Sequence, residues 1–166
     1  MEPHSRPASP HRGGHSALRV IVIDPAWRLF VPRAEHLVTR AAWAAGAGDA
    51  DGEADGEGAP METSIVLADD RLVRDLNMRH RGQNKPTNVL TYEHPAPELV
   101  LALGVIRREA AAAGRRIAYH LTHLVVHGVL HLRGHDHDHP GDARRMEMEE
   151  TRILHRLGVP NPWKRA

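Results

Sequence analysis

The chain has 166 residues, about the length of one domain, and its apolar fraction of 41% is sufficient for one hydrophobic core. It contains no cysteine, which excludes a disulfide framework and any metal site built on thiolates. No apolar run approaches the length of a membrane span, and the first residues lack the layout of a secretory signal, so we expect a cytoplasmic protein. Histidines and carboxylates are the ligands that remain for a metal ion.

Charge is unevenly distributed along the chain. The formal net charge is only +1, but six of the 21 acidic residues fall between positions 48 and 62, where there is no Lys or Arg. Without those six, 15 acidic residues stand against 22 basic ones. A moderately basic folded part is compatible with a polyanionic partner such as RNA, although it does not by itself indicate one.

The first half of the chain alternates predicted strands and helices. Residues 1–16 are polar and predict a disordered extension ahead of a single domain over residues 17–163. A β-branched run predicts a strand over 17–23, and an amphipathic pattern predicts a helix over 32–45. The stretch 46–60 predicts an acidic flexible loop. A strand over 63–67 then leads to a helix over 71–80, with Asp69 and Asp70 as its N-cap and first-turn acids.

The second half predicts two strands followed by three helices. After a polar loop, strands are expected over 89–93 and 99–102, joined by a connection short enough to be hairpin-like. Helices are expected over 105–113, 117–133 and 142–157, each followed by a glycine that ends it. The order predicts one α+β domain, in which a small four-stranded mixed sheet packs with about five helices.

The longest predicted helix carries a histidine pattern typical of a metal site. His127 and His131 are four residues apart, so they project from one face of a helix, one turn apart. Gly134 ends the helix, which allows the following turn to return His137 toward the same ion. Three protein ligands leave the fourth position of a zinc-like ion open for water, as in catalytic zinc sites. We therefore predict a metal site on the long helix and the following turn.

Residues close to this pattern leave alternatives open. His135 and His139 are rival third ligands, although Gly134 argues against a helix that continues to His135. His123 lies one turn before the first ligand, and a supporting or core role is favoured over metal binding. Asp136 is interpreted either as an acceptor that orients a ligand imidazole or as a simple turn residue.

The spacing of the three histidines and the glycine also matches the metzincin proteases, whose motif is His-Glu-x-x-His-x-x-Gly-x-x-His. In those enzymes the Glu after the first histidine is the general base. This chain has Gly128 at that position, so a protease of this kind would lack its base. The metalloprotease alternative is therefore disfavoured.

A polar loop upstream of the histidines offers donors for a phosphate. It opens on Arg81, whose guanidinium fork can donate two parallel hydrogen bonds to a phosphate. Lys85, Thr87 and Asn88 add donors nearby in the sequence, although ordinary turn chemistry explains these residue types equally well.

Two motifs together resemble the YbeY family of bacterial endoribonucleases. The family pattern His-Gly-x-Leu-His-Leu-x-Gly-Tyr-Asp-His is matched over residues 127–137, with His135 in place of Tyr as the single change. A second pattern, Tyr-Arg-x-Lys-Asp-x-Pro-Thr-Asn-Val-Leu-Ser-Phe, is matched at Arg81 and throughout Pro-Thr-Asn-Val-Leu. Met146 and Glu150 fit a Met and a Glu of the family's last helix, and the tail that ends at Trp163 is similar too.

The chain also departs from the family pattern. Departures in the second motif are His80 for Tyr, Gln83 for Lys, Asn84 for Asp, and Thr91-Tyr92 for Ser-Phe. Before the fourth strand, Pro97-Glu98-Leu99 stands where the family has Gly-Asp-Ile, which leaves the role of this longer acid open. The acidic stretch after Ala45 is similar to an insertion.

The resemblance implies one Zn2+ per chain on His127, His131 and His137, with Arg81 as the further catalytic residue. It implies a single-strand-specific endoribonuclease of small-subunit ribosomal RNA maturation and ribosome quality control. The implied partners are ribosomal RNA, the small ribosomal subunit, and ribosomal proteins or a ribosome-associated GTPase. In such a mechanism the ion activates water or polarises a phosphoryl oxygen while Arg81 binds the phosphate. The alternative is a non-catalytic ribosome-assembly factor whose metal only stabilises the fold.

Overall fold

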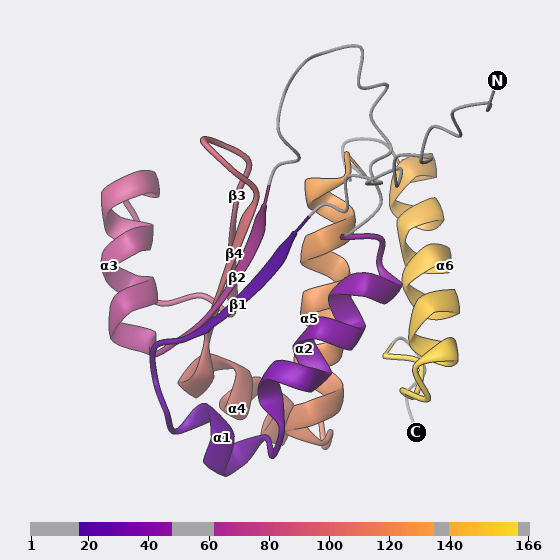
Figure 1. Cartoon of the computed structure of the whole chain (residues 1–166), viewed down its shortest axis with the longest axis horizontal. Helices are drawn as coiled ribbons and strands as arrows, with labels where there is room; N and C mark the ends of the chain where they lie inside the picture. The colour runs from indigo at the N-terminus through magenta and orange to yellow at the C-terminus, as the bar shows by residue number, and fades with distance from the viewer. Residues whose placement is uncertain (1–16, 48–61, 135–139, 163–166) are drawn as a thin grey trace, which may run out of the picture.

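A computed structural model describes the chain over residues 17–47, 62–134 and 140–162. Within these ranges the chain forms four strands and six helices (Figure 1). The strands are β1 (Leu18–Val22), β2 (Thr63–Ala68), β3 (Val89–Tyr92) and β4 (Glu98–Ala102). The helices are α1 (Trp27–Phe30), α2 (Ala34–Ala44), α3 (Asp70–Arg81), α4 (Leu103–Ala112), α5 (Ile117–Leu132) and α6 (Pro140–Arg156).

The predicted α+β domain with a small mixed sheet is confirmed. Each predicted strand and helix has a counterpart whose ends differ from the prediction by at most two residues. The exception is α1, a single turn that the sequence pattern does not predict. Its one buried side chain is Trp27, whose Nε1 donates a hydrogen bond to the Ala68 carbonyl at 2.8 Å. Residues 1–16 and most of the acidic stretch 46–60 lie outside the described ranges, so the predictions for them stay predictions.

The sheet has the strand order β1-β2-β4-β3. β1, β2 and β4 run parallel to one another, and β3 pairs antiparallel with β4 at one edge. Parallel neighbours need a crossover, which α2 provides between β1 and β2 and α3 begins between β2 and β4. The predicted hairpin-like connection joins β3 to β4 and contains a cis peptide bond at His94–Pro95.

Helices cover both faces of the sheet (Figure 1). Because successive side chains of a strand point to opposite faces, Ile65 and Leu67 of β2 pack with α2 and α5, whereas Val66 and Ala68 pack with α3. This two-sided burial explains why β2 is apolar at almost every position. Helix α6 joins the larger layer through three fully buried side chains, Met146, Ile153 and Leu154.

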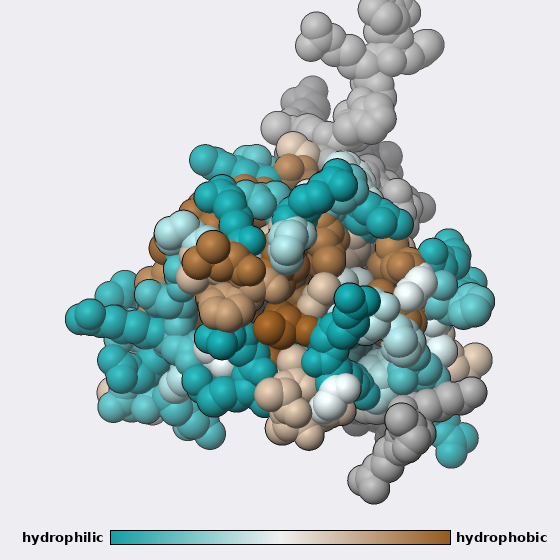
Figure 2. Space-filling view, turned by 90° about the horizontal axis from the view of Figure 1, so that it is seen from below, coloured by the Kyte–Doolittle hydropathy of each residue, from teal (hydrophilic) through white to brown (hydrophobic). Residues whose placement is uncertain are grey.

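The lower end of the molecule, where α1 and α4 lie in Figure 1, mixes apolar patches with a hydrophilic surround (Figure 2). Leu29 and Phe30 of α1 are among the exposed large hydrophobic side chains. The guanidinium of Arg107 on α4 lies 3.6 Å from the centroid of the Phe30 ring, a cation–π contact that links the two helices.

Candidate metal centre

Helix α5 carries a stripe of four histidines. His120, His123, His127 and His131 are spaced by three or four residues, so they follow one side of the helix. The ring centroids of successive histidines are 6.5, 6.2 and 4.6 Å apart. The other sides of α5 are apolar and buried, which fixes the direction of the stripe.

Gly128 lets α5 approach the sheet beside these histidines. A Cβ at this position would lie 2.4 Å from Cδ2 of Leu99 on β4 and 3.7 Å from Cγ2 of Thr91 on β3. Leu99 is fully buried, so its side chain has little room to move aside. Any side chain at position 128 would therefore point into the sheet, so this position cannot place a general base beside the histidines. This geometry supports the sequence-based argument against the metzincin mechanism.

His127 and His131 meet at their Nε2 atoms, which are 3.0 Å apart. Their rings are inclined by 72°. Two nitrogens bound to one tetrahedral Zn2+ at about 2.0–2.1 Å lie roughly 3.3 Å from each other, so the pair fits a shared ion. Without an ion, the same separation suits a hydrogen bond between one protonated and one unprotonated Nε2.

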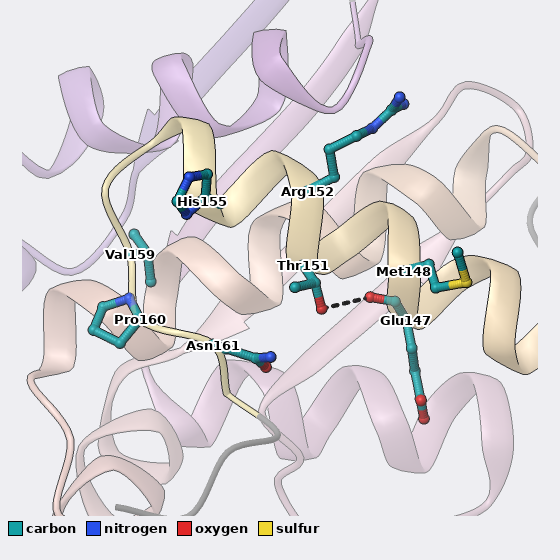
Figure 3. Close-up of a pocket in the computed structure, with 8 residues that line it drawn as sticks. All are labelled: Glu147, Met148, Thr151, Arg152, His155, Val159, Pro160 and Asn161. Atoms are coloured by element: carbon teal, nitrogen blue, oxygen red, sulfur yellow. Dashed lines mark hydrogen bonds between the residues drawn. The ribbon is translucent and has the colours of Figure 1, made fainter.

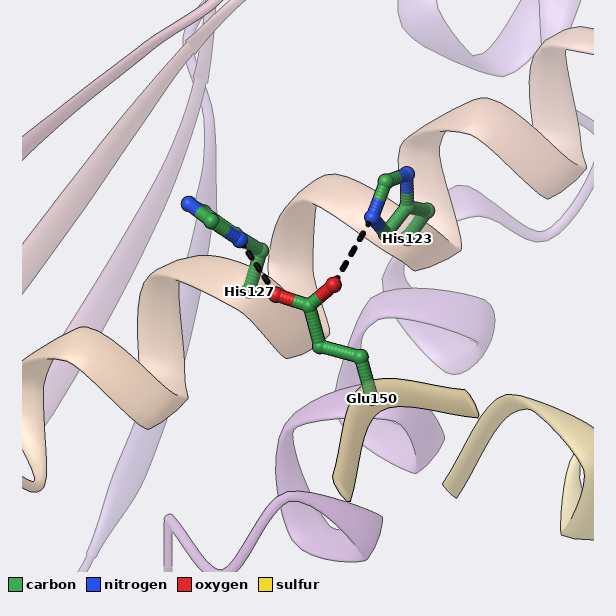
Figure 4. A group of neighbouring side chains, drawn as sticks. All are labelled: His123, His127 and Glu150. Carbon is green, nitrogen blue, oxygen red and sulfur yellow. Dashed lines mark hydrogen bonds and ion pairs between the residues drawn. The ribbon is translucent and has the colours of Figure 1, made fainter. Parts of the chain in front are cut away.

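Glu150 of α6 reaches between two histidines of α5 (Figure 4). Its Oε2 lies 3.2 Å from Nε2 of His123, and its Oε1 makes a short contact with Nδ1 of His127. The side chain of Glu150 is only 1% exposed. Figure 4 shows the second ring nitrogen of His127 pointing away from the carboxylate. Glu150 therefore contacts Nδ1 of His127, whereas Nε2 of the same ring points away from the carboxylate.

The charge state of Glu150 follows from these contacts. Burial alone raises the pKa of a carboxyl group, but the hydrogen bonds and charges of His123 and His127 outweigh it and hold the pKa of Glu150 at about 2. The carboxylate is ionised at neutral pH. A charge removed from water to this extent persists only where partners satisfy it, and here the two imidazoles are those partners.

Two sets of atoms in this cluster have metal-binding chemistry. Within the described ranges, one group of three side chains has ligand atoms all within 4.8 Å of one another, namely His123, His127 and Glu150. The other set is the Nε2 pair of His127 and His131. Glu150 contacts His127 at Nδ1, whereas the contact with His131 is made by Nε2, so the two sets meet opposite sides of the same ring.

Arg81 lies at the edge of the sheet close to this part of α5. It is the last residue of α3, which ends at Gly82 in a left-handed conformation with φ of 66°. The Nη2 atom of Arg81 donates a hydrogen bond of 3.4 Å to the Thr91 carbonyl of β3. The Thr91 side chain in turn lies next to Gly128, the neighbour of His127. Two segments far apart in sequence thus converge on one strand residue.

Two polar residues of the loop after α3, Asn88 and Lys85, make contacts with neighbouring helices. Asn88 donates to both carboxylate oxygens of Glu109 at 3.2 and 3.1 Å, and Glu109 also pairs with Nε2 of His120 at 2.7 Å. The Lys85 carbonyl accepts a hydrogen bond of 2.8 Å from the side chain of Asn77. For Asn88 and the Lys85 backbone, the structure shows contacts that anchor the loop between α3 and β3.

The structure brings together two of the three predicted ligands, His127 and His131. His137, its rivals His135 and His139, and Asp136 lie outside the described residues. The helix does end where Gly134 predicts it, because α5 stops at Leu132 and Gly134 has a φ of 87°.

The histidine pattern predicts no role for Glu150, yet the sequence holds a signal for it. On α6, Met146, Glu150, Ile153 and Leu154 are spaced by four, three and one residues and are all at most 1% exposed. A glutamate within such a buried stripe is seldom tolerated without a partner. The identity of the partner depends on how α6 packs against α5, which the local sequence does not encode.

A separate pocket of about 750 Å³ lies along α6 and the segment after it (Figure 3). Its lining includes Met148 and His155 of the helix and Pro160 beyond it, and none of its residues belongs to the histidine cluster. The hydrogen bond of 2.8 Å from Thr151 to the Glu147 carbonyl is an ordinary intrahelical contact. This pocket therefore contributes nothing to the candidate metal centre.

Fold and site together define an α+β protein with a candidate His/His/Glu metal site on two packed helices. The fold is similar to the solution structure of TM1509 from Thermotoga maritima, with a TM-score of 0.54 at 20% identity over 89% of this chain and 99% of that chain. At this identity the likeness shows the fold alone.

Sequence comparison identifies the family. The model of the family described as Endoribonuclease YbeY matches residues 40–158, and the chain belongs to this family. A relative named Endoribonuclease YbeY from Gluconobacter oxydans is 47% identical, over 100% of this chain and 94% of its own length. Another of the same name from Rhodopseudomonas palustris strain HaA2 is 40% identical, over 90% and 84%. The prediction of an endoribonuclease of this family is thereby confirmed.

Proposed function

We propose that this endoribonuclease is metal-dependent and cleaves single-stranded RNA in the maturation of small-subunit ribosomal RNA and in ribosome quality control. The observation that carries the proposal is the pair of Nε2 atoms of His127 and His131, which lie 3.0 Å apart on α5. The guanidinium of Arg81 is hydrogen-bonded to the carbonyl of Thr91 on β3, a strand that packs beside α5. A cation site and an exposed arginine on adjoining elements suit a phosphodiester, because both attract its negatively charged oxygens.

The proposed ligands of a single Zn2+ are Nε2 of His127, Nε2 of His131, and His137. Two observations favour this set over the group of His123, His127 and Glu150. Glu150 already contacts Nδ1 of His127 directly, as a hydrogen-bond partner would. Its side chain is 1% exposed, whereas that of His127 is 28% exposed, and an RNA substrate needs access to the ion.

In the proposed mechanism, an ion bound here supplies Lewis acidity, which polarises a phosphoryl oxygen or acidifies a water. Arg81 binds the scissile phosphate through its guanidinium fork and neutralises the charge that develops during cleavage. To do so it gives up its hydrogen bond to the Thr91 carbonyl, a long one at 3.4 Å. His127 and His131 would each offer one ring-nitrogen lone pair to the ion.

The proposed partners are ribosomal RNA and the small ribosomal subunit, with ribosomal proteins or a ribosome-associated GTPase. The excess of basic over acidic residues outside the acidic stretch supports an RNA partner. We also propose a cytoplasmic location, where ribosomes are assembled. Across the described ranges, no helix combines the length and apolarity needed to cross a membrane.

The decisive experiment measures metal content and RNA cleavage on the same preparations. His127→Ala, His131→Ala and His137→Ala should each lose the ion and the cleavage of ribosomal RNA. Arg81→Ala should keep the ion and the fold but lose cleavage by about 10²- to 10³-fold, the usual effect of removing one group that stabilises developing charge.

Other results would contradict the proposal. Cleavage that is unchanged in Arg81→Ala and His131→Ala would indicate a contaminating nuclease. A wild-type protein that retains its ion, binds ribosomal RNA and cleaves nothing would indicate a non-catalytic assembly factor. Full metal content in His137→Ala would assign the third position to another residue.

A further inference from the structure

We propose that Glu150 is a positioning residue for the metal centre, which holds His127 in the tautomer that presents Nε2 to the ion. The inference rests on the proposed ligand set of His127, His131 and His137. What carries it is the juxtaposition of a fully buried carboxylate on α6 with Nδ1 of a ligand histidine on α5 (Figure 4).

The two ring nitrogens of His127 have different roles. In a neutral histidine one nitrogen carries the proton and the other carries the lone pair that binds a metal. Carboxylate oxygens are hydrogen-bond acceptors, so the contact of Glu150 Oε1 with Nδ1 of His127 favours the tautomer that carries the proton on Nδ1. The lone pair is then on Nε2, the atom that lies 3.0 Å from Nε2 of His131. Carboxylate–histidine–metal arrangements of this kind orient ligands in other metalloproteins.

The carboxylate of Glu150 is held by the buried side of α6. Glu150 lies between Met146 and the pair Ile153 and Leu154 on the buried side of α6, and all four side chains are at most 1% exposed. The backbone that carries Glu150 is thus anchored in the core on both sides along the helix. The buried setting restricts the carboxylate, and its contact with Nδ1 in turn restricts the ring of His127.

His123 completes the arrangement. Its Nε2 lies 3.2 Å from Oε2, the carboxylate oxygen that His127 does not use, and its side chain is 13% exposed. The two histidines therefore hold the two oxygens of Glu150 from successive turns of α5 (Figure 4). This second contact keeps the carboxylate from rotating away from His127. His123 thereby supports the centre without binding the ion.

The competing assignment makes His123, His127 and Glu150 the ligands themselves. The two assignments differ at one atom: an ion held between Glu150 and His127 would take Nδ1, the nitrogen beside the carboxylate, whereas our assignment uses Nε2. Nitrogen resonances of the imidazole report the difference directly. In protein loaded with 113Cd2+ as the probe ion and labelled with 15N-histidine, we expect cadmium–nitrogen coupling at Nε2 of His127 and a protonated Nδ1.

Two substitutions test the positioning role through metal affinity. Glu150→Leu removes the acceptor, and Glu150→Gln keeps the shape and one acceptor oxygen but removes the charge. We expect Zn2+ affinity, measured by competition with a chelator, to fall roughly 10- to 100-fold in Glu150→Leu and by less in Glu150→Gln. Removal of His123 by His123→Phe should give a loss smaller than that of Glu150→Leu.

Glu149→Gln is the matched control. Glu149 is the neighbouring residue on α6, but its carboxylate pairs with Arg152 on the surface at 2.6 and 2.7 Å. Its substitution should leave Zn2+ affinity unchanged. Thermal unfolding of each metal-free variant separates a loss of affinity from a loss of fold, and Glu150→Gln decides the test if Glu150→Leu does not fold.

Two results would overturn the inference. One is cadmium coupling to Nδ1 of His127. The other is a Zn2+ affinity in Glu150→Leu or Glu150→Gln that equals that of the Glu149→Gln control. These results are distinguishable from failure of the proposed ligand set. If that set is wrong, His131→Ala and His137→Ala keep the ion, whereas if only the positioning role is wrong, they lose it and the Glu150 variants do not.

Discussion

Gly128 is a residue whose identity is explained by the packing of α5 on the sheet. It lies directly after His127, and its missing Cβ is what allows α5 to rest on Leu99 of β4. The histidine stripe lies on another side of the same helix turn. A position that faces the sheet cannot also face the metal centre, so the glycine here reflects helix–sheet packing rather than the loss of a catalytic base.

Substitution of Gly128 by alanine should destabilise the protein despite the better helix propensity of alanine. Propensity favours alanine by about 1 kcal/mol in a helix interior. The added Cβ would meet Leu99 at 2.4 Å, and overpacking of a buried site typically costs about 1–3 kcal/mol. We expect a net loss in the free energy of unfolding, measured by urea denaturation. Gly141→Ala in α6, where no atom of the described residues outside its own helix turn lies within 4 Å of the added carbon, should be neutral or stabilising.

At the scale of elements, two neighbouring aspartates stabilise the starts of two different helices, and the sequence pattern predicts only one of these roles. The pair Asp69 and Asp70 predicts the start of α3, and Asp69 does cap it, because its Oδ1 accepts a hydrogen bond of 2.8 Å from Leu72 N. Asp70 instead serves a second helix. Its Oδ1 accepts from Val105 N in the first turn of α4 at 3.0 Å, and its Oδ2 accepts from Arg108 at 2.8 Å.

Because the two aspartates cap different helices, their loss should have separate effects. We expect Asp69→Ala to cost about 1 kcal/mol, as N-cap removal usually does. Asp70→Ala should cost about 1–3 kcal/mol, since it leaves the backbone donor of Val105 without its partner. Chemical denaturation gives both values. Equal stability of Asp70→Ala and wild type would mean that water replaces the carboxylate at α4.

Local patterns account for what the sequence predicts and what it does not. The spacing of His127 and His131 needs only a helix to bring the two rings together, so the pair is predictable from sequence. Helix α1 has a single turn and therefore no apolar period to detect. The contact of Glu150 with His127 joins residues 23 positions apart on different helices, and the contact of Arg81 with Thr91 joins a helix to a strand. Both depend on tertiary packing, which sequence pattern alone does not fix.

On the scale of the whole molecule, metal binding should be visible in the stability of the fold. The proposed ligands belong to α5 and to the segment that follows it, and α5 packs against both the sheet and α6. An ion that binds only the folded chain stabilises it by about 3–4 kcal/mol when free metal is at 100 to 1,000 times its dissociation constant. For a chain of this size, that corresponds to an increase of roughly 10 °C in melting temperature.

Calorimetry of the zinc-loaded and chelator-treated protein checks this expectation. Arg81→Ala should show the same increase as wild type, because Arg81 acts on the substrate and not on the ion. His131→Ala should show little or no increase. An equal increase in His131→Ala would mean that zinc stabilises the fold through a site other than the proposed one.

The strand order places β3 at an edge of the sheet, which bears on self-association of the protein. An edge strand with free backbone groups invites pairing with another chain, and proteins discourage this with short strands, prolines and charged side chains. β3 has only four residues, two prolines follow it at 95 and 97, and Arg81 covers the Thr91 carbonyl. Replacing Arg81 therefore also uncovers part of this edge. Light scattering should accompany every assay of such a variant, so that self-association is not mistaken for lost catalysis.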